Sequence, residues 1–462
     1  MITNFHNPSD KRIYTERWPV MRGKKLFPVM DERSTEGTEE LLSVSHITGI
    51  TPRTQKNVTM FKSESLVGYK ICEKGDIAAN TMWTWQGAIG VSEHSGVVSP
   101  AYIVYRQKDN YYHPRYLDMM LREKYLVDVY RSISTGIRPS RLRLYPDPFL
   151  GIYFPVPPMD EQIKMVNYLD WKLSKINKVI SSKRKEISLL LEQRQRLIDD
   201  TLFAKCEKGN GEGETNPLGL VLPKDWQIIK FNGFFNFGKG LNITKKDLQE
   251  EGIAVISYGQ VHSKTNMGTE INDTLIRYVD ESYVQTSPKA LVNKGDFIFA
   301  DTSEDFAGVG NCVFVDRDDT IFAGYHTLIA RPKDGKEHRY LAYLFKSSLW
   351  RYQVRKKVNG VKVYSITQKI LKNALIFLPP VPEQEEVIMF LDDKCKMLSC
   401  AIEQITREIT SLQEMKKRLI SDVVTGKIDV REIDIPEYSI SLDDIDADMD
   451  DEYMEDEIDE EV

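Results

Sequence analysis

Two loops of the sequence contain side chains that could recognise a nucleic acid. Each loop follows a Lys-Gly-Asp turn, at residues 74–76 and 294–296, and a short apolar run typical of a β-strand. Amide and hydroxyl groups can hydrogen-bond base edges, and indole rings can stack on bases. The candidates are Asn80, Thr81, Trp85 and Gln86 in the first loop, and Thr302 and Ser303 in the second. For the tryptophans of the first loop the alternative is a place in the core.

A basic turn follows a predicted helix in each half of the chain. The helices are expected near residues 116–133 and 339–356, and the turns at 134–143 and 356–367. Lys and Arg side chains contact phosphates, which positions a protein on a duplex without reading its sequence. The candidates are Arg138, Arg141, Arg143, Lys356, Lys357 and Lys362. For each of them the alternative is a solvated surface charge.

The motifs of the common catalytic sites are missing from the sequence. A DNA methyltransferase needs a Gly-rich cofactor loop and an aromatic-flanked Pro-Pro site for the amino group, and neither is found. There is no G-x-x-x-x-G-K-[ST] phosphate loop. The seven histidines show no metal-binding spacing, and no nucleophile with a partner base can be singled out. We therefore predict a chain that is not an enzyme, with no catalytic residue, no metal site and no cofactor of its own.

Charge is distributed unevenly along the chain. The 462 residues carry a net charge of −7, but the segment after Arg431 holds 16 acidic residues and no basic one. Residues 1–431 therefore contain 62 basic against 53 acidic residues, a net charge of +9, which suits a polyanionic partner. The tail is expected to be disordered, because it has little apolar surface to bury and repels itself. It either solubilises the protein or competes with nucleic acid for the basic body.

The cysteines and the N-terminal residues indicate a reducing, cytoplasmic setting. The five cysteines are odd in number and form no C-x-x-C pair, which argues against a disulfide framework and a zinc ribbon. The N-terminus has no apolar signal segment, and no apolar run reaches the roughly 18 residues of a membrane span. We therefore expect a cytoplasmic protein that does not associate with a membrane.

An internal repeat organises the chain. Residues 157–200 and 379–422 align without a gap and share 16 identities over 44 positions. The two copies open with PPMDEQ and PPVPEQ, and Pro in a first helical turn costs no hydrogen bond. Each copy is therefore predicted to begin a long helix, and the chain to be a tandem duplication of a globular domain followed by a helix.

Apolar residues in the two predicted helices follow a heptad pattern, in which steps of three and four keep one seam toward a partner helix. The main seam positions are Leu169, Ile176, Ile180 and Ile187 in the first helix, and Leu391, Leu398, Ile402 and Ile409 in the second. Lys183 and Arg194 interrupt the first seam. A helix of about 40 residues is roughly 60 Å long. We expect the helices to pair with each other in antiparallel fashion; the alternative is that each packs only on its own domain.

The expected fold is α+β, with two similar mixed α/β domains separated by a long antiparallel two-helix coiled coil. The predicted segments are a first domain at 1–155, a central helix at 156–207, a linker at 208–219, a second domain at 220–378, a C-terminal helix at 379–425 and a disordered acidic tail at 432–462.

Three segments together carry a resemblance to a known family: PPMDEQIKMVNYLD, PPVPEQEEVIMFLD and the closing LISDVVTGKIDVR at residues 419–431. With these segments the chain resembles the specificity subunit of Type I restriction-modification systems. The resemblance covers roughly residues 1–431 and is weak in the globular domains. The first helix ends in DDTLFAKCEKG, without the Thr-Gly-Lys that ends the second, and the acidic tail does not belong to the family pattern.

The resemblance implies that each globular domain is a target-recognition domain that reads one half of an asymmetric bipartite site on double-stranded DNA. It also implies recruitment of two modification (methyltransferase) subunits, which bind S-adenosylmethionine. Restriction (translocase-nuclease) subunits would join them and bring ATP and Mg²⁺. Two alternatives stay open. The partner could be a single fused methylase-nuclease polypeptide, or the chain could be a coiled-coil scaffold that binds only protein and no DNA.

Overall fold

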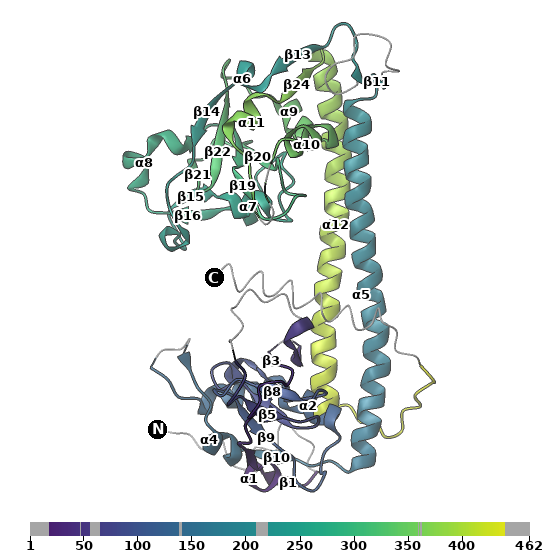
Figure 1. The fold of residues 1–462 in the computed structure, drawn as a ribbon. Helices are drawn as coiled ribbons and strands as arrows, with labels where there is room; N and C mark the ends of the chain where they lie inside the picture. The colour runs from purple at the N-terminus through teal and green to yellow at the C-terminus, as the bar shows by residue number, and fades with distance from the viewer. Residues whose placement is uncertain are drawn as a thin grey trace. The chain divides into compact units, whose positions relative to one another are not determined.

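The chain divides into two compact units in the computed structural model (Figure 1). The first unit comprises Met1–Glu186 and Ile405–Val462, and the second comprises Ile187–Gln404. The residues that the structure describes are 18–46, 48–55, 65–137, 141–208, 220–358, 360 and 363–438. Most of the predicted linker at 208–219, and the acidic tail beyond Tyr438, therefore lie outside the described residues.

The first unit is built around a four-stranded antiparallel sheet. Its strands lie in the order β2 (Val29–Met30), β9 (Ile103–Tyr105), β6 (Ile77–Ala79) and β7 (Ile89–Val91). Ile77 and Tyr105 pack in a large core on one face, whereas Ala78 and Val104 pack in a smaller core on the other. Because both faces of the sheet are covered, β6 is apolar at every position.

Two-stranded pairs and short helices complete the first domain. The pairs are β1 (Val20–Arg22) with β10 (Tyr153–Pro155), β3 (Leu42–Ser45) with β4 (Gly49–Pro52), and β5 (Lys70–Cys72) with β8 (Gly96–Val98). The helices are α1 (Gly23–Leu26), α2 (Pro114–Leu121), α3 (Lys124–Ile133) and α4 (Pro146–Gly151). Large rings fill the space between helices and sheet; those of Tyr105 and Phe149 lie 4.7 Å apart.

The second unit repeats this sheet. Its strands lie in the order β14 (Phe235–Lys239), β22 (Thr327–Pro332), β18 (Phe297–Ala300) and β20 (Cys312–Phe314), again antiparallel. Phe297 and Phe299 of β18 pack in one core, and Ile298 and Ala300 pack in another. The alternation along the central strand therefore divides the second domain into two cores in the same way as the first.

Further elements distinguish the second unit. A second, mixed sheet has the order β16 (Arg277–Val279), β15 (Ile253–Ile256), β21 (Ile321–Ala323) and β17 (Leu291–Val292). Two pairs join β13 (Gln227–Lys230) to β24 (Leu375–Leu378) and β19 (Thr302–Ser303) to β23 (Tyr364–Ser365). The main helices of the domain are α7 (Tyr258–His262), α9 (Arg339–Leu344), α10 (Ser348–Arg355) and α11 (Gln368–Lys372).

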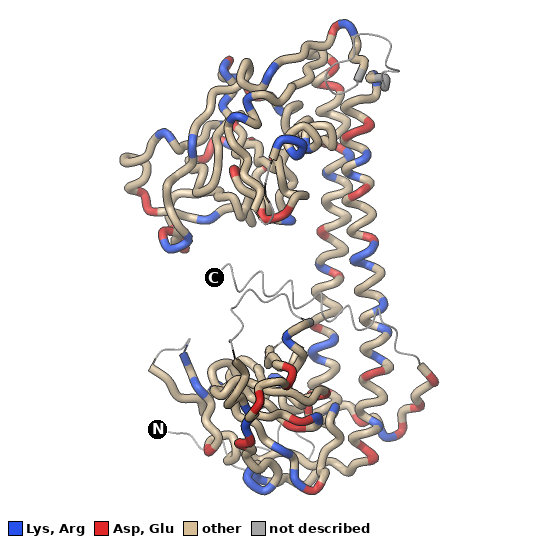
Figure 2. The backbone as a smooth tube through the Cα atoms, viewed as in Figure 1, with Lys and Arg blue, Asp and Glu red and all other residues tan. Residues whose placement is uncertain are grey.

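The two long helices are α5 (Met159–Leu202) and α12 (Val381–Val424), each of 44 residues. The repeated glutamine forms the same hydrogen bond at the start of each helix. Gln162 donates from Nε2 to the carbonyl of Pro157 at 2.8 Å, and Gln384 makes the same bond to Pro379 at 2.8 Å. The sequence Pro-Pro-x-x-Glu-Gln thus has a structural use, in which the glutamine ties the first helical turn to the prolines before it. Lys and Arg are interspersed with Asp and Glu along both helices (Figure 2).

Segments of α5 and α12 pair antiparallel within each unit. In the first unit Lys416 donates to Asn177 at 3.3 Å, and Lys183 forms an ion pair with Glu408. Residue numbers thus rise along α5 while they fall along α12. In the second unit Lys205, just beyond α5, lies 3.1 Å from the carboxylate of Glu383, which continues the same order. The predicted α+β fold with antiparallel helices is confirmed. The charge that interrupts the seam at Lys183 is accommodated by an acidic partner.

The predicted seam residues divide into two groups. Ile176, Ile180 and Ile409 are buried along the long helices. Leu169 and Leu391 are fully buried instead in the cores of the first and second domains. Ile187, Leu398 and Ile402 are partly exposed. The helices therefore pack both on each other and on their own domains, so the alternative that each packs only on its own domain is wrong.

A repeated aspartate ties each helix to its domain. Asp170 of α5 lies 2.8 Å from a guanidinium nitrogen of Arg115 at the start of α2. Burial raises the pKa of Asp170, and the charge of Arg115 opposes that shift. Asp392 of α12, its counterpart, binds Arg339 at the start of α9 through both carboxylate oxygens. The pairing of an acid on the long helix with an arginine on the domain is thus duplicated.

The end of α12 and the residues after it complete the core of the first domain. The hydroxyl of Tyr116 donates to the carbonyl of Val424 at 3.1 Å. Gly426 has a φ of 73°, a left-handed conformation that ends helices and that glycine adopts without strain. Val430, beyond this turn, is 1% exposed and packs in the same core as Val424. The closing Thr-Gly-Lys-Ile-Asp-Val segment is therefore an integral part of the first domain.

Candidate nucleic-acid interface

The Lys-Gly-Asp turn of the first domain is held by a buried carboxylate. Gly75 has a φ of 94°, which disfavours any residue with a Cβ. Asp76 is 2% exposed and accepts a hydrogen bond from the backbone N–H of Glu73 at 2.9 Å. Arg106 donates to both oxygens of Asp76, at 2.7 and 2.8 Å. The turn before the candidate loop is thereby fixed to the neighbouring strand β9.

The second domain holds its turn in the same way. Gly295 has a φ of 92°, and Asp296, also 2% exposed, accepts from the N–H of Asn293 at 2.8 Å. Arg331 of β22 donates to Asp296 through Nε and Nη2. We call this glycine, aspartate and arginine arrangement the turn framework. Each copy sets where the loop after the central strand begins.

The polar residues of the first loop are used to build the loop. Asn80 donates to the hydroxyl of Tyr102 at 3.1 Å and accepts from the N–H of Met82 at 3.2 Å. Thr81 donates to the carbonyl of Ala101 at 3.0 Å. Both side chains are 7% exposed. The hypothesis that Asn80 and Thr81 present their side chains to bases therefore has no support in the structure, because their polar atoms already have partners within the domain.

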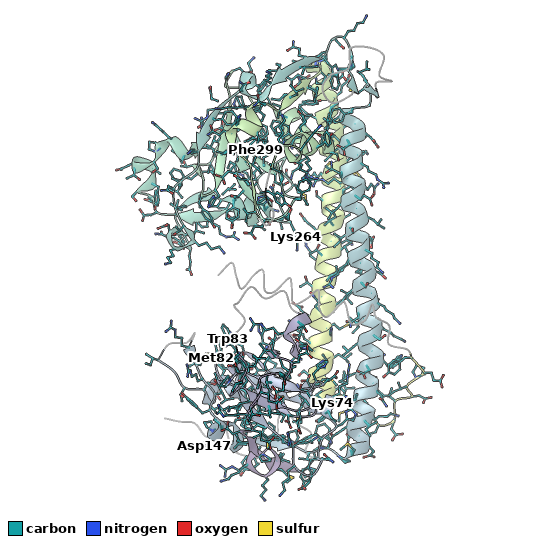
Figure 3. The ribbon with its side chains drawn as sticks, in the orientation of Figure 1. Lys74, Met82, Trp83, Asp147, Lys264 and Phe299 are labelled. Atoms are coloured by element: carbon teal, nitrogen blue, oxygen red, sulfur yellow. The ribbon has the colours of Figure 1, made fainter. Side chains whose placement is uncertain are left out.

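The two tryptophans of this loop have different surroundings. Trp85 is 6% exposed and donates to the carbonyl of Met82 at 2.7 Å, so it is the core residue that the sequence left as an alternative. Trp83 is 45% exposed and stacks on Trp85 with ring centroids 6.4 Å apart. Met82 is 39% exposed beside it (Figure 3), and Gln86 is partly exposed. The available stacking surface is thus Trp83, supported from below by Trp85.

Arginines lie next to this surface. The guanidinium of Arg131 in α3 lies 5.3 Å from the ring centroid of Trp85. The basic turn is joined to the loop because Leu144 donates its N–H to the carbonyl of Thr81 at 3.0 Å. Arg141 and Arg143 of that turn are exposed, as phosphate contacts would require. Arg138 lies outside the described residues.

The loop of the second domain presents a different ring. Ser303 is 1% exposed and donates to the carbonyl of Asp305 at 2.7 Å, so it too holds the loop rather than facing solvent. Thr302 is partly exposed and donates to Asp301 at 2.7 Å. Phe306 is 49% exposed and meets the ring of Tyr364 edge-on at 5.4 Å. Phe306 therefore takes the place that Trp83 has in the first domain.

A pair of arginines in α10 supports this loop. Arg351 and Arg355 both donate to the carbonyl of Ala307. The guanidinium of Arg355 also lies 5.5 Å from the centroid of Phe306. Burial, and next the positive charge of Arg355, lowers the pKa of Arg351. Asp199 and Asp305 oppose this shift, and two neighbouring guanidinium groups can together bind an anion such as a phosphate.

Sequence reasoning missed Arg131 and Arg355, although a signal for them exists. Glu123 and Ser347 are the N-cap residues of α3 and α10, and each arginine comes eight positions after its cap. Each arginine then lies over an aromatic ring of the loop that follows the turn framework. The phosphate-contact candidates predicted nearby do not lie over a ring of the loop. Lys356 is exposed, Lys357 reaches the carbonyl of Asn373 at 3.4 Å, and Lys362 lies outside the described residues.

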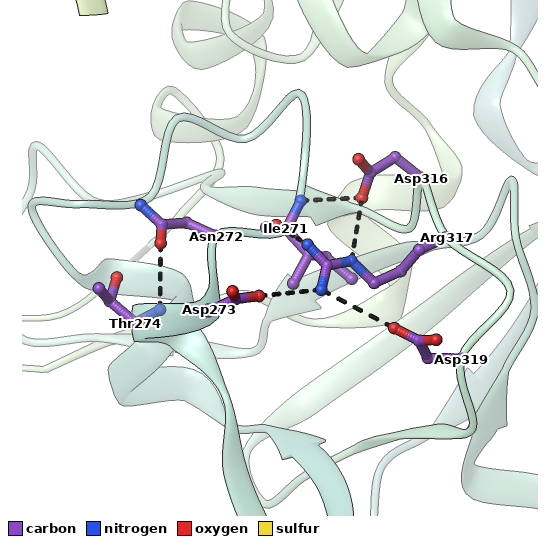
Figure 4. Close-up of polar contacts among 7 residues, drawn as sticks. All are labelled: Ile271, Asn272, Asp273, Thr274, Asp316, Arg317 and Asp319. Atoms are coloured by element: carbon purple, nitrogen blue, oxygen red, sulfur yellow. Dashed lines mark hydrogen bonds and ion pairs between the residues drawn. The ribbon is translucent and has the colours of Figure 1, made fainter. Parts of the chain in front are cut away.

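An acidic cluster in the second unit serves the structure of the domain. Arg317 lies between Asp273 at 3.0 Å and Asp319 at 3.8 Å (Figure 4). Asp316 accepts from the N–H of Ile271 at 2.9 Å, which joins the two loops. Arg317 and the backbone N–H of Ile271 are the partners of these carboxylates, so the cluster joins loops of the domain. Within the described parts of the chain, no group of three or more His, Cys, Asp or Glu residues could hold a metal ion.

Two buried thiols are kept protonated by their surroundings. All five cysteines are free. Burial raises the pKa of Cys72 and of Cys312 to about 12, which keeps both protonated. No helix in the described ranges is long and apolar enough to span a bilayer.

Comparison with known proteins identifies the class of this fold. Residues 223–411 match the family described as "Type I restriction modification DNA specificity domain". Two relatives come from Methanocaldococcus jannaschii. The chain is 22% identical to the Type I restriction enzyme MjaVIII specificity subunit, over 90% of this chain and 94% of the relative. It is 24% identical to the putative type I restriction enzyme MjaX specificity subunit, over 44% of this chain and 46% of the relative. The chain is therefore similar to Type I restriction-modification specificity subunits over most of its length.

One solved structure shows a similar fold, and a second one aligns more weakly. A chain from a study of the complex assembly and conformational transition of the type I R-M system aligns with a TM-score of 0.53 and 15% identity, over 90% of this chain and 99% of that one. The HsdS subunit from Thermoanaerobacter tengcongensis aligns with a TM-score of 0.39 and 15% identity, over 89% and 97%.

Proposed function

We propose that the chain reads an asymmetric bipartite sequence on double-stranded DNA, with one half-site for each target-recognition domain. One observation carries this proposal. The turn framework and the arginine after the cap are duplicated, whereas the exposed loop residues differ, with Met82 and Trp83 in one domain and Phe306 in the other. Equal frameworks with unequal exposed surfaces suit two readers of different sequences.

The chemistry of each surface supports contact with a duplex. An exposed aromatic ring can insert against or stack on bases, and cation–π contacts hold the arginine beside it. Exposed arginines of the basic turn add charge for phosphates. Contacts of this kind make affinity fall steeply with salt, because each neutralised phosphate releases counterions.

We also propose that the chain recruits catalytic subunits, and its similarity to specificity subunits and an exposed apolar surface support this. Met389, Phe390 and Met397 of α12 are 70%, 45% and 61% exposed. Exposed apolar side chains clustered on one helix suit a protein partner. We propose that this surface contributes to binding of the modification subunits, and that restriction subunits join the assembly. Converting Met389 and Met397 to Glu should then reduce copurification of the modification subunits while leaving each domain folded.

We further propose that this chain contributes recognition without catalysis, in the cytoplasm. S-adenosylmethionine, ATP and Mg²⁺ would be bound by the partner subunits. A metal added to the purified chain should then leave its thermal unfolding unchanged. A shift of the unfolding temperature at stoichiometric Mg²⁺ would contradict this assignment.

The direct test maps methylated adenines in the genome of a host with and without this chain. The expected result is one motif of two unequal blocks separated by unread positions. A continuous motif, or methylation that does not depend on the chain, would overturn the proposal. Replacing residues 1–155 with the first domain of another specificity subunit should alter one block only. The composition of the purified complex decides between separate partners and one fused methylase-nuclease.

A further inference from the structure

An open hollow of about 490 Å³ lies in the second domain, beside the loop that follows β18. Polar side chains dominate its wall, among them Asp301, Thr302, His326, Ser365, Gln368 and Lys239. Thr302 and Ser365 face each other as partners in the short β19–β23 pair. The hollow is thus formed by the same loop whose far end carries Phe306.

The backbone of Asp301 is fixed on both sides. Its N–H donates to the carbonyl of His326 at 3.0 Å, and its carbonyl accepts from the N–H of Ile366 at 2.7 Å. His326 itself has a φ of 53°, a conformation that few non-glycine residues adopt. Two segments distant in the sequence therefore hold Asp301 at the wall of the hollow, with its position set by backbone bonds.

Only one of the two carboxylate oxygens of Asp301 has hydrogen-bond partners among the described residues. Oδ1 accepts from the hydroxyl of Thr302 at 2.7 Å and lies 3.2 Å from Nδ1 of His326. Oδ2 has no hydrogen bond within the described parts of the chain, and Asp301 is about one-third exposed. An oriented carboxylate oxygen without a partner, in an open polar hollow, is an acceptor available to a ligand.

The remaining groups limit what that ligand can be. A phosphate would be repelled by the carboxylate, whereas an amino group would be attracted. Gln368 and Lys239 line the same hollow, and neither side chain has a hydrogen bond or ion pair among the described residues. Carboxylates accept from the exocyclic amino group of a base in the major groove, and oppose the carbonyl acceptors of guanine and thymine.

We propose that this hollow reads one base pair in the half-site of the second domain, with Asp301 accepting a hydrogen bond from the amino group of adenine or cytosine. This inference rests on the proposed function, since it assigns one position of the DNA target to a named residue. It makes the recognised base at that position depend on a single carboxylate oxygen.

The test uses Asp301→Asn in the assembled complex. The amide retains an oxygen for Thr302 and replaces the unpartnered oxygen with a donor, so the variant is nearly isosteric. Binding selection from randomised DNA should show discrimination at one position of one block weakened by roughly tenfold or more. All other positions, and the whole other block, should keep their preferences. Gln368→Ala, at the rim of the hollow, should alter preference at the same or the adjacent position.

Two controls make the outcomes distinct. Asp225→Asn changes an exposed aspartate of the same unit and should leave the motif unchanged. If Asp301→Asn and Gln368→Ala both keep the full motif, the inference is overturned while the proposed function stands. A uniform loss of affinity for all sequences also overturns it, because a structural role would act in that way. If the unmodified complex selects no motif, the proposed function itself fails.

Discussion

The two globular domains place an arginine over an aromatic ring in the same way, but they bury that ring to different extents. In the first domain Arg131 lies over Trp85, which is 6% exposed and has Trp83 stacked on it. In the second domain Arg355 lies over Phe306, which is 49% exposed itself. The difference teaches that one added ring changes the surface offered to DNA while the turn framework beneath it stays the same.

The largest expected effect comes from breaking the turn framework. Asp76→Ala leaves Arg106 without its buried partner, and Asp296→Ala does the same to Arg331. Each substitution removes hydrogen bonds to a charged group and leaves a backbone N–H without its acceptor, at a cost on the order of 2 kcal/mol. We expect each variant to lower the free energy of unfolding of its own unit by about this amount, measured by urea denaturation. Asp225→Ala, at an exposed site, serves as the control.

Equal losses in the two variants would support equivalent frameworks. A loss of stability in only one of the two variants would show that the two sheets share their strand order but not the energetic role of the turn framework. If neither variant differed from Asp225→Ala, the ion pair would have no role in fixing the loop, and the comparison between the domains would break down.

A buried lysine should make the second unit sensitive to pH. Burial lowers the pKa of Lys346 to about 7, from 10.5 for a free side chain. Between these values the unfolded chain binds more protons than the folded one, so stability rises as pH increases through this window. The contribution of Lys346 should increase by up to about 2 kcal/mol from pH 7 to pH 9, and Lys346→Met should remove it.

The corresponding position of the first domain, one residue before the cap of α3, is Arg122, and an arginine keeps its charge throughout this window. Arg122→Met should therefore leave the pH dependence of stability unchanged. Urea denaturation of the two variants at pH 7 and pH 9 measures the contrast. The same slope for Lys346→Met and the original chain would contradict the prediction.

A smaller effect is expected from the two duplicated arginines. Arg131→Ala and Arg355→Ala should each weaken DNA binding by roughly 1 kcal/mol and reduce the slope of log K against log salt by about one. The dissociation constant measured at several salt concentrations gives both quantities. Lys224→Ala, an exposed lysine outside the loops, should leave the slope unchanged. An unchanged slope for both arginine variants would mean that neither side chain lies near a phosphate.

The smallest expected change is in stability, on truncation of the exposed rings. Trp83→Ala and Phe306→Ala should alter the free energy of unfolding by no more than about 0.5 kcal/mol, because both rings are about half exposed. The same variants should weaken DNA binding. Each should alter the preference of one half-site only. A large drop in stability would show that these rings are structural, as Trp85 is.

The long helices could be predicted from sequence because their signals are local. Pro-Pro starts and heptad spacing depend only on neighbours along the chain. The roles of Leu169 and Leu391 could not be predicted from sequence. An apolar residue of this kind can pack against a partner helix or in a domain core, and only the tertiary structure decides which of the two it does. The surroundings of the polar loop candidates could not be predicted for a related reason. Asn80 has the right chemistry for a base, but its amide is already bonded to Tyr102 and to the backbone.

The exposed tryptophan is the clearest limit of sequence reasoning. Trp83 and Trp85 are two residues apart and chemically identical, and their exposure differs because the 3-10 turn between them places one ring over the other. Residue type alone cannot tell which of the two rings is more exposed. The position of Arg131 and Arg355 relative to their helix caps could have been read from sequence, once the duplication was extended to α3 and α10.

The packing of Val430 and the contact between Tyr116 and Val424 have a consequence for biosynthesis. The first domain is translated before the second unit, yet its core is closed by Val424 and Val430, which follow the second unit in the chain. The second unit, formed by Ile187–Gln404, is contiguous and can fold while the rest is still being made. Folding is therefore completed in the reverse of the order of synthesis, and a chain that stalls before α12 ends keeps an open aromatic core that chaperones and proteases can detect.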